Sequence, residues 1–167
     1  PKDVQALIAC EKRLGVEPTL LNAVHQTNVL QIQKIIKLVE KTLVNIKNKK
    51  ITILGLSFKE ESDDIRESRS IKLIEMLLKE QSTIIVHDPK AIKNTKLIFG
   101  DKITYNEKVE DALNNSDCIV LMTPWKQYSK LQKIDLRKMR KKNIIDTRRI
   151  LNIRGSDINY IGLGIGY

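Results

Sequence analysis

The sequence predicts an α/β fold in which a long helix precedes a parallel sheet, and three observations lead to this prediction. Residues 20–46 contain no glycine or proline, which favours one uninterrupted helix. Residues 51–89 have the pattern of strand, helix and strand, and such βαβ units wind right-handed into parallel sheets. Two further apolar runs, at 118–123 and 143–146, are continuous, as in strands buried on both faces.

The composition is that of an ordinary globular chain. Of its 167 residues, 41% are hydrophobic, which argues against disorder. No apolar run approaches the roughly 18–20 residues that span a bilayer, so we expect no membrane partner. The first ten residues lack a signal-peptide layout, and Cys10 and Cys118 share no metal-ligand or redox spacing. These features predict a cytoplasmic protein.

The chain carries a net charge of +10, from 30 basic and 20 acidic residues. A charge of this size is compatible with nucleic-acid binding. However, the lysines are scattered, and aromatic residues make up only 4%, so no platform for stacking bases is visible. We therefore expect no nucleic-acid partner. The excess charge predicts a lysine-rich solvated surface or mild attraction for an anionic metabolite.

Residues 1–48 are predicted to form a helical segment, and residues 49–167 a sheet domain. A helix over residues 1–14 has one apolar side and ends at Gly15. Cys10 within it is expected to be a small core hydrophobe. Pro18 begins the next helix, which would be about 40 Å long over residues 20–46. The polar, basic stretch 45–50 marks the boundary.

The long helix carries an apolar seam whose residues recur at alternating four- and three-residue steps: Ile32, Ile36, Val39, Leu43 and Ile46. Such a seam would leave apolar surface uncovered on an isolated domain, and an exposed patch usually marks an interface. We therefore predict a homodimer through the long helix. The alternative is that this helix packs only on its own domain.

The remaining elements follow from short patterns. Residues 90–100 look irregular, 103–105 suggest a short strand, and Asn106 is a plausible N-cap for a helix that continues to Leu113. Residues 134–139 suggest a short helix, and 160–166 a last strand or turn. The runs 118–123 and 143–146 end at Pro124-Trp125 and Thr147-Arg148-Arg149.

The loop 57–70 is the first candidate site, because ligands in open parallel sheets bind beyond the carboxyl ends of strands. A dinucleotide fingerprint needs three glycines there, and only Gly55 is present. The sequence therefore predicts a Rossmann-like sheet without a complete NAD site. Lys59 places a positive charge where a sugar or phosphate could lie. Its alternative role is a surface lysine balanced by Glu60 and Glu61.

Two charged groups follow the strands. Asp63, Asp64, Arg66 and Glu67 could form a salt-bridged loop, and their spacing does not match a calcium loop, so we expect no metal. Arg148 and its neighbour Arg149 follow a buried strand, and two arginines at such an end form an anion site.

Several of these stretches together resemble the UDP-glucose/GDP-mannose dehydrogenase family: GLSFK at 55–59, DDIRES at 63–68, HDPKA at 87–91, TPW at 123–125, DTRR at 146–149, and PKD at 1–3. Enzymes of this family oxidise a nucleotide sugar to its uronic acid with two NAD. The resemblance implies that this chain is a C-terminal part, with a central helix where subunits meet and a UDP-binding domain. It implies that the NAD domain lies outside the chain.

The resemblance also implies roles for individual residues. The substrate-binding residues would be Phe58, Lys59 and Arg148, although the family usually has glycine where this chain has Thr147. Arg66 would reach NAD on the other domain, and its fork suits phosphate. Lys2 would lie at the cofactor, and Asp3 would assist the acid–base steps.

The family's nucleophilic cysteine lies two residues before Pro-Lys-Asp, so the resemblance places it upstream of Pro1, and Cys10 does not align with it. The chain alone is therefore expected to be inactive. Trp125 with Tyr128 resembles the branch that oxidises UDP-glucose for polysaccharide biosynthesis. Branches acting on UDP-N-acetylmannosamine or GDP-mannose stay open. A stand-alone nucleotide-binding module and a basic nucleic-acid-binding protein are alternatives from other classes.

Overall fold

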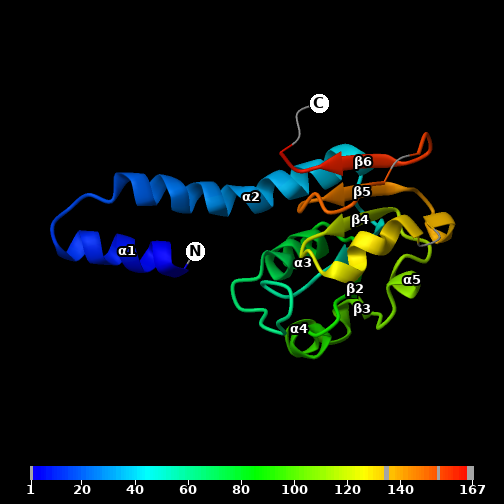
Figure 1. Ribbon diagram of the computed structural model, residues 1–167, viewed down its shortest axis with the longest axis horizontal. Helices are drawn as coiled ribbons and strands as arrows, with labels where there is room; N and C mark the ends of the chain where they lie inside the picture. Colours follow the sequence, from blue (N-terminus) through cyan, green and yellow to red (C-terminus); the bar gives the residue numbers. More distant parts are fainter. Residues whose placement is uncertain (1, 134–135, 154, 165–167) are drawn as a thin grey trace.

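The computed structural model describes residues 2–133, 136–153 and 155–164. A six-stranded sheet has the order β3-β2-β1-β4-β5-β6, and every neighbouring pair is parallel (Figure 1). The strands are β1 (Lys50–Leu54), β2 (Thr83–His87), β3 (Thr104–Tyr105), β4 (Cys118–Leu121), β5 (Asn143–Asp146) and β6 (Asn159–Gly162). This order confirms the predicted parallel, Rossmann-like α/β fold.

Both faces of the sheet are covered. Along β4, Cys118 and Val120 join one apolar core, while Ile119 and Leu121 join a second core on the opposite face. This alternation follows from the two-residue period of a strand, and burial on both faces explains why the sequence of β4 is continuously apolar. The predicted strands at 118–123 and 143–146 are therefore confirmed.

The βαβ unit is also confirmed, since β1 and β2 flank α3 (Arg69–Lys79). The next stretch corrects a prediction, because residues 90–100, expected to be irregular, contain the helix α4 (Ile92–Phe99). The Asp88 carboxylate fixes the turn that leads into this helix: Oδ1 accepts hydrogen bonds from the backbone N–H groups of Lys90 and Ala91 at 2.9 and 2.8 Å. Sequence reasoning assigned Asp88 no such role.

The helix expected after Asn106 is shorter and begins later, as α5 (Val109–Ala112). Asn106 does not cap it, because the N-cap position falls at Lys108 and no side chain caps the helix. Short 3-10 helices occupy Gly100–Lys102, Lys126–Lys133 and Leu136–Lys138. Of the helix predicted at 134–139, the structure shows a short 3-10 helix at Leu136–Lys138. Residues 134–135 lie outside the described ranges.

The N-terminal helices are α1 (Lys2–Arg13) and α2 (Thr19–Leu43). They pack against each other, and Figure 1 shows α1 and the first half of α2 extending away from the sheet as a helical hairpin. Cys10 is exposed on α1, so the expectation of a core cysteine was wrong. The long helix ends three residues before Ile46, where Val44 adopts a φ of 64°.

The apolar seam packs inside this chain. Its five residues are all buried, with exposures of 8% or less, and they join the core that contains β1, β2 and α3. The prediction that the seam stays uncovered was therefore wrong, because the sheet's own face covers it. Residues from both sides of the boundary expected at residue 48 therefore share one apolar core. The division into a helical segment and a sheet domain stays a prediction. Among the described helices, none is both long enough and apolar enough to cross a membrane.

Candidate functional site

The loop after β1 is held by three neighbouring segments. The hydroxyls at the start of α3 donate to it, from Ser70 to the Gly55 carbonyl at 2.7 Å and from Ser68 to the Leu56 carbonyl at 2.6 Å. Thr123, after β4, donates its hydroxyl to the Ser57 carbonyl at 2.7 Å. The loop backbone is therefore fixed relative to both β4 and α3.

Asp88, directly after β2, is the third anchor and is only 2% exposed. Its Oδ2 accepts hydrogen bonds from the backbone N–H groups of Leu56 and Ser57 at 2.7 and 3.1 Å, and from the Trp125 indole at 3.0 Å. Because Oδ1 also holds the turn that leads into α4, a single carboxylate ties this turn to the ends of β1 and β4. A carboxylate accepts at both oxygens and so can satisfy all these donors at once.

A cavity of about 210 Å³ opens between the ends of β1 and β4. We call it the switch-point cavity, because the strand order reverses there and open α/β sheets bind ligands at that point. Its walls come from the loop after β1, the start of α3 and the ends of β4 and β5: Ser57, Phe58, Ser68, Arg69, Ser70, Met122, Thr123 and Arg148.

Arg148 reaches this cavity from the end of β5. The buried Asp146 shapes its turn, since Oδ1 accepts from the backbone N–H groups of Arg148 and Arg149 at 2.9 and 2.7 Å. The Arg148 Nε donates to the Met122 carbonyl at 2.6 Å. Desolvation, and secondly the charge of Arg69, lower the pKa of Arg148. The turn tolerates Thr147 where the family usually has glycine, because the residue with a positive φ is Arg149, at 58°, and not Thr147.

The other predicted site residues lie in different surroundings. Phe58 lines the switch-point cavity, whereas Lys59 is exposed and is not among the cavity's lining residues. Arg66 is 88% exposed and pairs with Asp64, with Nη2 and Oδ2 2.8 Å apart, and this contact lowers the pKa of Asp64 to about 2. The salt-bridged loop that the sequence suggested is therefore present around Arg66.

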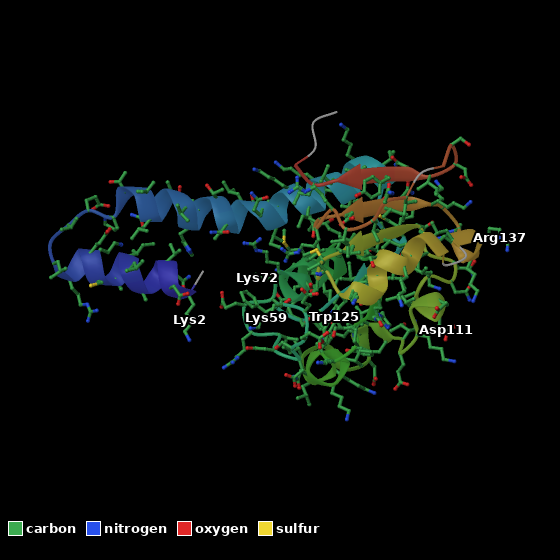
Figure 2. The ribbon with its side chains drawn as sticks, in the orientation of Figure 1. Lys2, Lys59, Lys72, Asp111, Trp125 and Arg137 are labelled. Carbon is green, nitrogen blue, oxygen red and sulfur yellow. The ribbon has the colours of Figure 1, made fainter. Side chains whose placement is uncertain are left out.

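Lys2 and Asp3 lie at the exposed beginning of α1, outside the switch-point cavity (Figure 2). A second cavity of about 210 Å³, which we call the interhelical cavity, brings Gln5 of α1 together with α2 and α3. Arg69 lines both cavities. The start of α1 therefore folds back toward the region of the site.

Trp125 and Tyr128 are buried rather than lining the cavity. The Tyr128 hydroxyl donates to the His87 carbonyl at 3.0 Å, and burial raises the pKa of Tyr128 well above its usual range. Burial also lowers the pKa of His87, whose Nδ1 lies 2.8 Å from the same hydroxyl. These side chains fix the end of β2 and so position Asp88.

Sequence reasoning missed Arg69, Ser57 and Met122 as cavity residues. One signal was available, since Arg69 directly follows the Ser68 N-cap of α3, and helix N-termini attract anions. Met122 and Ser57 carry no comparable sequence signal, and only their places at strand ends bring them to the cavity. Within the described ranges, no group of three or more His, Cys, Asp or Glu residues could hold a metal ion.

Comparison with known proteins is consistent with this geometry. Residues 52–153 match the model of the UDP-glucose/GDP-mannose dehydrogenase family, UDP binding domain. The UDP-glucose 6-dehydrogenase AglM of Haloferax volcanii is 36% identical over 154 residues, which are 92% of this chain and 35% of that protein. A UDP-glucose 6-dehydrogenase of Rickettsia bellii is 31% identical, over 97% of this chain and 38% of that protein. The chain thus spans about a third of the length of such curated relatives.

Among solved structures, a UDP-glucose dehydrogenase from Pyrobaculum islandicum superposes with a TM-score of 0.86 at 31% identity, over 97% of this chain and 36% of that one. A GDP-mannose dehydrogenase from Pseudomonas aeruginosa shares the fold, with a TM-score of 0.78 at 24% identity, over 97% of this chain and 38% of that one. The family match covers more than half of the chain. This chain therefore belongs to the UDP-glucose/GDP-mannose dehydrogenase family and contains its UDP-binding domain.

Proposed function

We propose that this chain is the C-terminal part of an NAD-dependent UDP-glucose 6-dehydrogenase and that it holds the UDP moiety of the substrate. The whole enzyme would oxidise UDP-glucose to UDP-glucuronate with two NAD. The alternatives are the same oxidation of UDP-N-acetylmannosamine or GDP-mannose. The 36% identical relative is a UDP-glucose 6-dehydrogenase, which favours UDP-glucose.

One observation carries this proposal: Arg148, from the end of β5, lines a cavity at the strand-order switch. Among the described residues, it forms no ion pair with a carboxylate. An unpaired arginine in a cavity suits the phosphates of a nucleotide, because its guanidinium can hold phosphate oxygens bidentately. Phe58 adds an apolar ring for the base or the sugar.

The described residues do not fit a whole NAD. The loop after β1 has a single glycine, and a Cβ on Gly55 would meet the Thr123 backbone at 2.5 Å, so this glycine serves packing and offers no pyrophosphate cradle. We propose that NAD binds mainly to another domain of the parent enzyme, with Arg66 and Lys2 reaching it from this chain.

The roles proposed for this chain's residues follow their positions. Arg148 and Phe58 would orient the nucleotide, and Lys59, exposed on the same loop, would contact the sugar. Asp3, on α1, would exchange a proton during the acid–base steps of the oxidation. The nucleophilic cysteine of the family has no counterpart in this chain, so we expect the chain alone to be inactive.

Substitution of two arginines tests the proposed site. We expect Arg148→Ala to weaken UDP binding by about tenfold to a hundredfold, because a charge-assisted hydrogen bond contributes roughly 1.5–3 kcal/mol. Arg66→Ala is the charge-matched control and should leave UDP affinity nearly unchanged, because its proposed partner is NAD. Titration calorimetry on both variants separates these roles.

Loss of UDP binding in Arg66→Ala with normal binding in Arg148→Ala would overturn the assignment. The same assay includes random-sequence duplex DNA at physiological ionic strength. Tighter binding of DNA than of UDP would favour the nucleic-acid alternative, whose affinity would fall steeply with salt.

We also propose that the chain forms a homodimer, and that the contact lies on the outer part of the helical hairpin rather than on the buried seam. Large apolar side chains are exposed along this part of the hairpin: Leu7 54%, Leu14 75%, Val16 54%, Leu20 76%, Val29 54% and Leu30 47%. Exposed apolar surface gathered on one projection usually marks an interface.

Sedimentation velocity tests the dimer. The unmodified chain should sediment as a dimer at tens of micromolar, roughly a test for micromolar affinity. The double variant Leu20→Asp, Val29→Asp should sediment as a monomer, because each change places a charge in the contact. Leu97→Asp is the matched control, since Leu97 is 87% exposed on α4, away from the hairpin. A monomeric unmodified chain would refute this proposal.

A further inference from the structure

Arg69 stands at an electrostatically unfavourable place. It is the first residue of α3, and that first turn contains no acidic residue. The N-terminal end of a helix carries partial positive charge, which stabilises anions and disfavours cations. A sequence that breaks such a local rule often does so at a functional site. An anion bound there would offset this unfavourable charge.

Within the described part of the chain, no carboxylate forms an ion pair with Arg69. Its Nη2 donates to the neutral Oδ1 of Asn28 on α2 at 2.7 Å. The Asn28 amide is fixed in turn, because its Nδ2 donates to the Val24 carbonyl at 3.1 Å. Asn28 therefore holds the guanidinium of Arg69 in place without neutralising its charge.

Arg69 also faces a second cation. Both Arg69 and Arg148 line the switch-point cavity, and the charge of Arg69 acts on the Arg148 guanidinium. Two like charges around one small cavity repel each other unless an anion lies between them. A group with two negative charges would relieve this repulsion and the unfavourable helix end at once.

We infer that Arg69 is a second phosphate-binding residue of the substrate site, positioned by Asn28, and that Arg69 and Arg148 hold the diphosphate of the nucleotide sugar between them. This inference rests on the proposed function and extends it by a residue from α3. It also links α2 to substrate binding, since Asn28 of that helix sets the position of the guanidinium. A diphosphate has enough oxygens to accept from both forks.

Calorimetry with UDP and with inorganic pyrophosphate tests the role of Arg69. We expect Arg69→Ala to weaken both by about tenfold to a hundredfold. Arg69→Lys keeps the charge but loses the fork, so it should bind with intermediate affinity. Lys72→Ala is the control, because it removes the same charge from the same helix and lines only the interhelical cavity. Its affinities should stay near those of the unmodified chain.

The outcomes are distinguishable. Equal losses in Arg69→Ala and Lys72→Ala would reduce the effect to general electrostatics and overturn the inference. Normal binding in Arg69→Ala, with weakened binding in Arg148→Ala, would overturn it and leave the proposed function standing. Failure of the unmodified chain to bind UDP would overturn both.

A double-mutant cycle tests the positioning role of Asn28. Asn28→Ala should weaken UDP binding on its own but should add little in the Arg69→Ala background, because the two side chains act as one unit. Independent, additive losses would show that Asn28 does not act through Arg69. Unfolding midpoints of the variants, measured alongside, should match that of the unmodified chain.

Discussion

Replacing Gly55 by alanine is expected to lower the free energy of unfolding by roughly 3–5 kcal/mol, a large part of the stability of a domain this size. Gly55 has a φ of 92°, and an added Cβ would lie 2.5 Å from both the Cβ and the backbone nitrogen of Thr123. The backbone cannot move away easily, because the Gly55 N–H donates to the His87 carbonyl and its own carbonyl accepts from Ser70.

Urea unfolding followed by the fluorescence of the only tryptophan, Trp125, measures this cost. Gly15→Ala is the matched control: Gly15, in the left-handed turn that ends α1, also has a positive φ, of 73°, but nothing lies within 4 Å of an added Cβ. It should cost about 1–2 kcal/mol, the price of the left-handed conformation alone. Similar losses in the two variants would show that the contact with Thr123 is not the cause.

Replacing Asp88 by asparagine should have a comparable effect on stability, of roughly 3–5 kcal/mol, and should also weaken nucleotide binding. An amide has one acceptor oxygen, and its NH₂ would face either the N–H groups of Lys90 and Ala91 or those of Leu56 and Ser57. Each buried donor left unsatisfied costs about 1–3 kcal/mol. The loop that carries Phe58 would then lose its anchor.

Urea unfolding and UDP calorimetry together measure the two effects of Asp88→Asn. Asp111→Asn on α5 is the control, because it makes the same chemical change at an exposed carboxylate and should alter stability by less than about 0.5 kcal/mol. Normal stability in Asp88→Asn would mean that this network does not hold the strand ends together.

The strands could be predicted because each is short, apolar and bounded by polar or turn residues. A run such as 118–121 is apolar at every position only when both of its faces are buried, so the sequence alone indicates a central parallel strand. By contrast, α4 was missed because the turn that leads into it is held by the side chain of Asp88. That residue read simply as the first of an Asp-Pro turn.

The candidate site was predicted in part, for a related reason. Arg148 and Phe58 follow strands directly, and parallel strands deliver their carboxyl ends to one edge, so both were expected near the ligand. Lys59 follows the same strand, yet it is exposed and is not among the residues that line the cavity. In a loop, the surroundings of a side chain depend on contacts with distant parts of the chain. Such contacts leave no periodic pattern in the sequence.

The sequence by itself determined the α/β class, the βαβ unit, the family and the apolar seam of the long helix. Only the tertiary structure decided that the chain's own sheet covers this seam, and that Arg69 meets Arg148 across the strand-order switch. The physical reason is that periodicity shows which face of a helix is apolar but not which surface covers it. Strand order, which is set by long-range packing, decides which distant side chains share a cavity.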